Sequence, residues 1–237
     1  MNVFVDMEHQ KLRVEHPELW AEVCRRRVAA KYRFEEIGAE PCYLLHYSRF
    51  SAKLLEELNP RVVIFSGHNM DHSEYAADEI TPIQSYFRAP GYPTFCICGS
   101  FQLLAKTYGA SIGPIGNKTV SGEGRIDPII PATARSETGF CSIELGRKPG
   151  TAFHRASARM EVFQHHFWEV KSLPDGFQTI ATSPVTKIQA IQHETKPLIG
   201  VQFHPEDYEE DSSDGRILIE QVFTWANQYE ESNPIRN

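Results

Sequence analysis

Short apolar runs alternate with longer amphipathic stretches along the first hundred residues. The apolar runs 2–5, 41–45, 61–65 and 93–98 have the length and the bounding turn residues of buried strands. Apolar positions recur at helical spacing over about 17–37, 51–58 and 80–87, and again from Phe101 to Tyr108 before Gly109. This alternation predicts an α/β fold with a mostly parallel central sheet.

The second half of the chain has a different pattern. Between Ser111 and Ala190, short strand-like runs and turn residues replace the long amphipathic stretches. This change predicts antiparallel strands added to the parallel sheet. No internal repeat is evident, and 237 residues, 41% of them hydrophobic, suffice for one sizeable core, so we expect a single domain over 1–237.

A predicted strand-to-helix junction contains the first candidate reactive group. The apolar run that ends in Cys98 meets Gly99 and Ser100, and a helix is expected to follow. The first N–H groups of a helix lack intrahelical partners, and their partial positive charge favours a thiolate. We interpret Cys98 as an exposed nucleophile, although a lone cysteine is more often a buried, unreactive residue.

A later segment, Gly200-Val-Gln-Phe-His-Pro-Glu206, supplies a base and a carboxylate. On a strand, residues two apart share a face, so we expect His204 and Glu206 to point the same way. Glu206 would then orient the imidazole, whose other nitrogen would exchange a proton with Cys98. These residue types together predict a Cys98–His204–Glu206 triad.

These two segments resemble the class I glutamine amidotransferases. That family has its cysteine in a Gly-x-Cys-x-Gly-x-Gln turn and its His-x-Glu pair after a Gly-Val-Gln-Phe strand, and the likeness covers most of residues 60–226. It implies a flavodoxin-like three-layer fold and hydrolysis of the side-chain amide of L-glutamine through a Cys98 γ-glutamyl thioester. It also implies that Gln102 helps to bind glutamine and that the backbone around Gln164, His165 and His166 holds the amino-acid end of this substrate.

The cysteine turn departs from the family pattern at three positions. Cys96 and Ser100 stand where glycine is usual, and both are small enough for the close approach of strand and helix that the turn needs. Phe101 stands where the family commonly has histidine. We expect this ring to change the packing or a partner surface rather than the chemistry.

The loop after the apolar run 61–65 is expected to form the oxyanion hole. It reads Ser-Gly67-His68-Asn69, whereas the family tends to have Ser-Gly-Gly-Pro. Backbone N–H groups must point at the developing oxyanion, which often requires positive φ, and histidine and asparagine tolerate that conformation. The resemblance implies that the donors lie in the Gly67-His68 loop and at Gly99.

Other charged and metal-ligating residues give weaker signals. His68, Asp71 and His72 could share an ion, but no fourth ligand is indicated, and we expect neither a metal nor another cofactor. We expect the basic run 25–27 on the solvated face of a helix. The acidic stretch 206–214 is expected to be solvated or to dock a basic partner.

Composition narrows the class of protein. A formal charge of −7 argues against general nucleic-acid binding, and no apolar run is long enough to span a membrane. Five irregularly spaced cysteines fit a reducing compartment, and the N-terminus lacks the pattern of a signal peptide. We therefore expect a cytoplasmic protein.

Three functions remain open at this point. The leading one is an amidotransferase subunit that gives its ammonia to a separate synthase, because the chain lacks the phosphate-binding glycine loop of a synthetase. The second is a stand-alone hydrolase of another γ-glutamyl amide, with a specificity changed by His68, Asn69 and Phe101. The third is a non-catalytic binding or regulatory relative, against which the intact Cys98, His204 and Glu206 argue.

Overall fold

A nine-stranded sheet organises the chain in the computed structural model, which describes residues 1–116, 135–146, 148 and 150–232. Its strand order is β2-β1-β3-β4-β11-β10-β9-β6-β7. The first five strands are parallel, namely β2 (Cys42–His46), β1 (Asn2–Asp6), β3 (Val62–Phe65), β4 (Thr94–Ile97) and β11 (Leu198–Val201). The others run antiparallel, namely β10 (Ala190–His193), β9 (Phe177–Thr182), β6 (Glu137–Leu145) and β7 (Arg159–His166).

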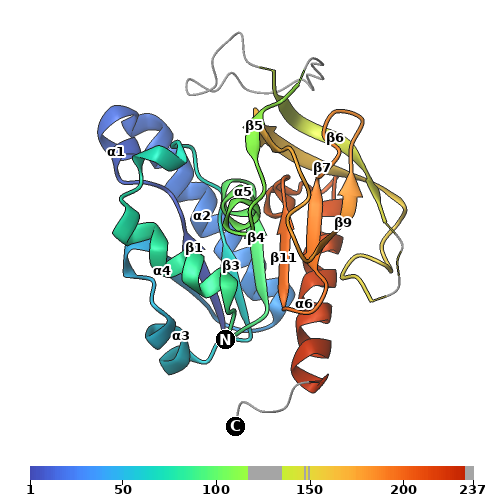
Figure 1. Ribbon diagram of the computed structural model, residues 1–237, viewed down its shortest axis with the longest axis horizontal. Helices are drawn as coiled ribbons and strands as arrows, with labels where there is room; N and C mark the ends of the chain where they lie inside the picture. The colour runs from blue at the N-terminus through green and yellow to red at the C-terminus, as the bar shows by residue number, and fades with distance from the viewer. Residues whose placement is uncertain (117–134, 147, 149, 233–237) are drawn as a thin grey trace.

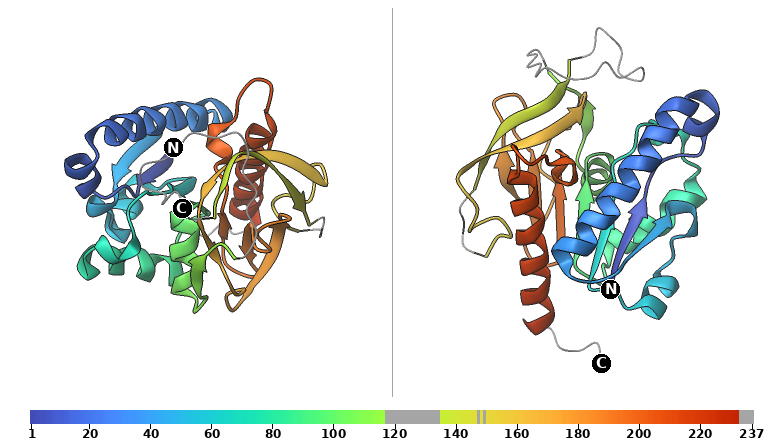
Figure 2. Two further views of the ribbon diagram at one scale, coloured as in Figure 1. Left: turned by 90° about the horizontal axis from the view of Figure 1, so that it is seen from above. Right: turned by 180° about the vertical axis from the view of Figure 1, so that it is seen from behind.

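Helices cover both faces of the parallel half of the sheet, as Figures 1 and 2 show. On one face lie α2 (Pro17–Gly38) and α6 (Asp214–Ser232), and on the other lie α4 (Ala77–Arg88) and α5 (Gly99–Thr107). Phe34 and Val222 belong to the core on the first face, and Phe87 and Leu104 belong to the core on the second. The predicted three-layer α/β architecture is confirmed.

The elements follow the sequence pattern closely in the first half. The helix α3 (Ala52–Leu58) and the strands β1 to β4 lie within one or two residues of their expected positions. The pattern did not predict α1 (Lys11–Glu15), which lies in a polar stretch, or the C-terminal helix α6. The expected antiparallel strands are present on either side of residues 117–134, which lie outside the described part of the chain.

A small second sheet lies beside α5. It consists of β5 (Ile112–Pro114) and β8 (Trp168–Val170), which pair antiparallel. Figure 1 shows β5 continuing upward from the region of α5 toward the antiparallel strands. This sheet therefore brings the chain around Trp168 close to the start of α5.

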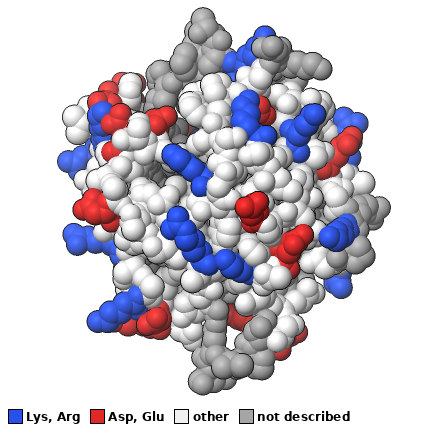
Figure 3. Space-filling view, viewed as in Figure 1, with Lys and Arg blue, Asp and Glu red and all other residues white. Residues whose placement is uncertain are grey.

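Charged side chains of both signs are interspersed over the face shown in Figure 3. No basic residues gather there into one large patch, which agrees with the acidic balance of the sequence. Among the helices in the described ranges, none is both long and apolar enough to cross a membrane.

Candidate active site

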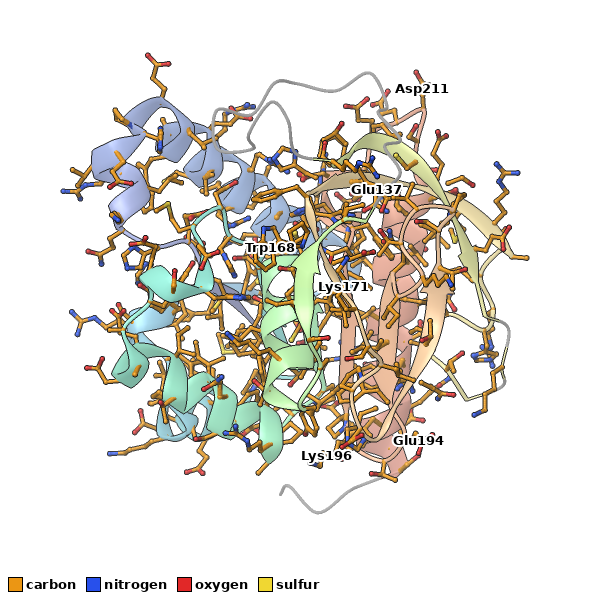
Figure 4. The ribbon with its side chains drawn as sticks, turned by 45° about the horizontal axis from the view of Figure 1, so that its top comes forward. Glu137, Trp168, Lys171, Glu194, Lys196 and Asp211 are labelled. Atoms are coloured by element: carbon orange, nitrogen blue, oxygen red, sulfur yellow. The ribbon has the colours of Figure 1, made fainter. Side chains whose placement is uncertain are left out.

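The carboxyl ends of four neighbouring parallel strands meet at one edge of the sheet. Glu8 follows β1, Gly67 follows β3, Cys98 follows β4 and His204 follows β11. Ligands of open α/β sheets bind at this edge. A cavity of about 660 Å³ opens beside it, and its lining includes Cys98, Gln102, His165, His166 and Trp168. Figure 4 brings this edge forward and labels Trp168.

Cys98 occupies the predicted strand-to-helix turn and lines the cavity, but the prediction that it is exposed is wrong, because only 6% of the residue is accessible to solvent. It directly precedes α5, and its backbone N–H donates to the carbonyl of Val201 at 2.7 Å. Its φ of 50° and ψ of −108° are unusual for a residue with a side chain, and such conformations concentrate at functional sites. Cys96 is completely buried in the core, and burial holds the pKa of its thiol well above the ordinary value.

His204 and Glu206 are both buried and face each other. The Nδ1 atom of His204 lies 2.9 Å from Oε1 of Glu206. However, the prediction that both lie on one strand is wrong, because β11 ends at Val201 and Glu206 belongs to the 3-10 helix η3 (Pro205–Asp207). Pro205 has no N–H with which to extend a ladder, and the tight turn after it returns the carboxylate to the imidazole.

The surroundings of His204 favour its charged form. Burial lowers the pKa of the imidazole. The Glu206 carboxylate and the hydrogen-bonded Cys98 sulfur raise this pKa by more, so that its value is about 10. The geometry thus places a cationic imidazole next to a sulfur atom. This arrangement can stabilise a thiolate and can supply a proton to a leaving group.

The loop that follows β3 packs directly against the cysteine turn. A Cβ atom added to Gly67 would lie 3.1 Å from Cβ of Cys98 and 3.0 Å from Cε1 of His204. A Cβ on Gly99 would clash with the imidazole ring of His68. The prediction of positive φ at His68 or Asn69 is wrong, since neither residue adopts it. Hydrogen bonds from elsewhere in the chain hold this loop instead.

His68 and His72 are paired with each other. Nδ1 of His68 lies 2.8 Å from the carbonyl of Met70, so it is this nitrogen that donates, and Nε2 accepts from Nε2 of His72 at 3.0 Å. Burial and the neighbouring His72 lower the pKa of His68 to about 3, and burial also lowers the pKa of His72. Both rings are therefore neutral, and Asp71 bonds to the backbone of Ser73 rather than to them.

A different group of possible metal ligands lies in the part of the chain that the structure describes. His204, Glu206 and Asp207 are close enough to share an ion. However, Asp207 forms an ion pair with Arg26, and Glu206 already bonds to His204. These interactions account for the grouping without a metal.

The residues predicted to bind substrate lie in two different environments. Nε2 of Gln102 donates to the carbonyl of Trp168 and to Oε1 of Gln202, both at 3.1 Å, and Gln202 in turn lies 3.6 Å from Sγ of Cys98. Gln102, His165 and His166 line the cavity. Gln164 does not, because its side chain is buried and donates to Gln189 at 3.1 Å.

A buried carboxylate contacts a residue of the cavity wall, and nothing in the sequence pattern pointed to it. Glu137 on β6 lies 3.1 Å from Nε2 of His166 and accepts hydrogen bonds from Thr186 and Gln189 at 2.7 and 2.8 Å. Nδ1 of His166 lies 2.8 Å from the carbonyl of Trp168. Figure 4 labels Glu137 and Trp168, which these contacts connect through His166.

The basic run 25–27 is not a solvated face, so that prediction is wrong. Only Arg25 is exposed, whereas Arg26 pairs with Asp207 and Arg27 is buried against Asp6. Helical spacing could have located Arg27, because it shares a face with buried residues three, four and seven positions away, Ala30, Val23 and Phe34.

The acidic stretch 206–214 is only partly solvated. Glu206 and Asp207 turn inward within η3, and Oδ2 of Asp214 accepts a hydrogen bond from the backbone of Glu161 at 2.7 Å. The exposed acidic residues between them are Glu209, Glu210 and Asp211. The surface available for a basic partner is therefore smaller than the sequence suggested.

Residues 30–223 match the family model of the class-I glutamine amidotransferases. The chain belongs to this family, and the resemblance found in the sequence is confirmed. It is similar to one subunit of the glutamine-hydrolysing GMP synthase of Methanothermobacter thermautotrophicus, with 34% identity over 51% of this chain and 55% of that protein. It is also similar to the glutamine-hydrolysing GMP synthase of Gibberella zeae, with 36% identity over 62% of this chain and 24% of that protein.

Solved structures agree on the fold. A putative GMP synthase subunit from Thermoplasma acidophilum superposes with a TM-score of 0.72 at 20% identity, over 99% of this chain and 98% of that one. In sequence, the aligned part spans only 55% and 57% of the GMP synthase subunits from M. thermautotrophicus and Archaeoglobus fulgidus.

Proposed function

We propose that this protein hydrolyses the side-chain amide of L-glutamine, with Cys98 as nucleophile, His204 as acid–base group and Glu206 as the carboxylate that orients it. The observation that best supports this proposal is the buried His204–Glu206 pair at 2.9 Å. Glu206 and the Cys98 sulfur together raise the pKa of the imidazole to about 10. Membership of the glutamine amidotransferase family supports the same reaction.

In the proposed reaction, the Cys98 thiolate attacks the carbon of the glutamine side-chain amide and the carbonyl oxygen becomes an oxyanion. Backbone N–H groups of His68 and Gly99 stabilise that charge. The His204 imidazolium gives its proton to the leaving nitrogen, so ammonia departs and a γ-glutamyl thioester remains. Neutral His204 then takes a proton from water, which attacks the thioester and releases glutamate.

The cavity offers groups for the amino-acid end of glutamine. Gln102 lines it beside Cys98, and His165 and His166 form the adjacent wall. The Trp168 carbonyl bonds to Nδ1 of His166, and the Glu137 carboxylate lies close to its Nε2, so this part of the wall is placed before substrate binds. Gln164 would contribute through its backbone alone, because its side chain bonds to Gln189.

We further propose that residues 1–237 work as one domain and deliver ammonia to a separate synthase. The similarity to proteins named as single subunits of a glutamine-hydrolysing GMP synthase supports this role, and it makes a GMP synthase partner the first candidate. The 24% coverage of the G. zeae GMP synthase supports it too, because that protein extends far beyond the part matched here. Five free cysteines support a reducing compartment such as the cytoplasm.

Release of ammonia and glutamate from L-glutamine by the purified protein tests the proposed reaction. We expect equal amounts of both products, complete loss of release in Cys98→Ala, and retention in Cys96→Ala, whose thiol is buried away from the cavity. Release that persists in Cys98→Ala would exclude this cysteine as the nucleophile. No release from wild type, even with the synthase partner, would favour a non-catalytic relative.

The size of the cavity gives a second candidate function. The lining extends beyond Cys98 to Met70, Lys106 and Ile112, which leaves room for a γ-glutamyl amide with a larger leaving amine. A panel of γ-glutamyl amides with amines of increasing size would test this alternative. Faster turnover of a larger amide than of glutamine would favour it, and a panel that is inert apart from glutamine would remove it.

A further inference from the structure

The turn Gly67–Asn69, here called the oxyanion turn, is held at both ends by charged residues that the proposed reaction does not use. Glu8 lies in the connection after β1, and Arg27 lies on α2. Glu8 is completely buried and Arg27 nearly so. Burying a charge is costly unless it is paired, so two such residues at the edge of the site call for an explanation.

Arg27 binds the first peptide of the turn. Its Nη2 donates to the carbonyl of Gly67 at 2.7 Å, while its Nε donates to Asp6 at 2.9 Å. The hydroxyl of Ser66 donates to the same Gly67 carbonyl at 2.7 Å. Two donors therefore fix the direction of this one carbonyl group.

Fixing this carbonyl also fixes an N–H group. In a trans peptide the C=O of one residue and the N–H of the next point in opposite directions. Because the Gly67 carbonyl points to Arg27, the N–H of His68 points away from it. Gly67 lies against Cys98 and His204, and no acceptor for the His68 N–H is found among the described residues.

Glu8 holds the other end of the turn. Its carboxylate accepts from the backbone N–H of Asn69 at 3.0 Å and from the Asn69 side-chain amide at 2.6 Å. The two successive N–H groups of the turn thus differ. The Asn69 N–H donates to Glu8, whereas the His68 N–H remains available to a ligand in the site.

We propose that Arg27 is a positioning residue for glutamine hydrolysis, which aims the His68 N–H at the oxyanion by holding the Gly67 carbonyl. Glu8 supports it from the opposite end of the turn. This inference rests on the proposed function of Cys98, but it concerns a residue that touches neither substrate nor Cys98. It explains why an arginine occupies the apolar face of α2.

Replacement of Arg27 separates this role from general support of the fold. We expect Arg27→Met to lower kcat for glutamine about 100-fold, as does loss of one oxyanion donor, with little change in KM. The rate at which iodoacetamide alkylates Cys98 should stay within about twofold, because alkylation needs the thiolate but forms no oxyanion. Arg27→Lys should recover part of kcat. The matched control is Arg25→Met, since Arg25 is exposed on the same helix and, within the described part of the chain, bonds to Glu22.

The inference is overturned if Arg27→Met keeps kcat within about threefold of wild type, or if alkylation falls in step with kcat. Should Arg27→Met fail to fold, Ser66→Ala removes the other donor to the same carbonyl without removing a charge. We expect it to lower kcat about tenfold, again with normal alkylation. Full activity in both Ser66→Ala and Arg27→Lys would contradict the inference.

A second measurement does not depend on turnover. The backbone amide signal of His68 in an NMR spectrum should shift in Arg27→Met and stay unchanged in Arg25→Met. An unchanged His68 signal would refute the inference even in a protein that does not hydrolyse glutamine. If the wild-type protein does not hydrolyse glutamine, by contrast, the proposed function is refuted but the inference about Arg27 is not.

Discussion

Cys98 has a backbone conformation that residues with side chains avoid, and this strain is testable. A non-glycine residue at φ 50° and ψ −108° costs about 1–3 kcal/mol. Glycine adopts such angles freely but loses about 0.5–1 kcal/mol to the greater freedom of the unfolded chain. We predict that Cys98→Gly is about 1 kcal/mol more stable than Cys98→Ala, as measured by chemical denaturation. A glycine variant of equal or lower stability would mean that the turn is unstrained.

The His204–Glu206 pair should make stability depend on pH. The pKa of His204 is raised from 6.5 to about 10, so the stabilisation is fully present below pH 6.5 and is lost as pH rises toward 10. We predict that Glu206→Gln lowers the free energy of unfolding by about 3 kcal/mol near pH 6.5 and by less near pH 10. Denaturation of both proteins across this range measures the difference, and a deficit that grows with pH would contradict it.

Motifs pointed to the residues proposed to react, whereas the residues that support them could not be predicted in the same way. Cys98, His204 and Glu206 lie in short segments whose chemistry is evident from neighbouring residues. Arg27 and Glu137 act through partners 40 and 49 residues away, Gly67 and Thr186, which only the folded chain brings together. In the sequence, a charged residue that is buried against a partner cannot be distinguished from one on the surface unless the partner is known.

At the scale of elements, the close approach of α5 to β11 depends on one glycine. A Cβ on Gly200 would lie 2.7 Å from Cδ2 of Phe101, which is completely buried. This contact accounts for the unusual Phe101 as a packing residue between helix and sheet. Ser100 has a role of its own, because its hydroxyl donates to the carbonyl of Ser66 and ties α5 to the oxyanion turn.

We predict that Gly200→Ala destabilises the protein by about 2 kcal/mol through overpacking against Phe101. The double variant Gly200→Ala/Phe101→Leu should be less destabilised than the sum of the single variants, since a smaller side chain makes room for the methyl group. The control is Gly91→Ala, whose added Cβ would meet no atom within 4 Å. Thermal unfolding measures all four, and strictly additive effects would contradict the proposed contact.

The pattern of apolar and polar residues predicted those elements in which burial follows a simple period. It failed where one or two residues determine where an element begins or ends. The strands β1, β3 and β4 are continuous apolar runs and lie where expected. The end of β11 at Val201 was missed, because the apolar Phe203 suggested further strand while Pro205 prevents it. The short helix α1 has only one buried residue, Leu12, so its sequence contains almost no periodic signal.

At the scale of the whole molecule, alternation of strands and helices was sufficient to predict the parallel half of the sheet. The order of the antiparallel strands was not predictable, because β6 pairs not only with β7, the next strand along the chain, but also with the more distant β9. Which surface a partner would cover is likewise not evident from the pattern of single residues.

A role as an amidotransferase subunit predicts that the isolated protein is a slow glutaminase. Binding of its synthase should raise kcat for glutamine about tenfold or more, since each protein then stabilises the active state of the other. Ammonia release measured with and without a candidate GMP synthase partner would detect this change. Full-rate hydrolysis by the isolated chain, unaffected by any synthase, would favour a stand-alone hydrolase.

The central claim is that Cys98 forms a covalent γ-glutamyl intermediate. The most direct test is acid quenching during turnover of L-glutamine, followed by mass spectrometry of the peptide that contains Cys96 and Cys98, with fragmentation to locate the adduct. We predict a glutamyl adduct on Cys98, none on Cys96, and none in Cys98→Ala. Ammonia release without any adduct on Cys98, or an adduct on Cys96 alone, would contradict the account.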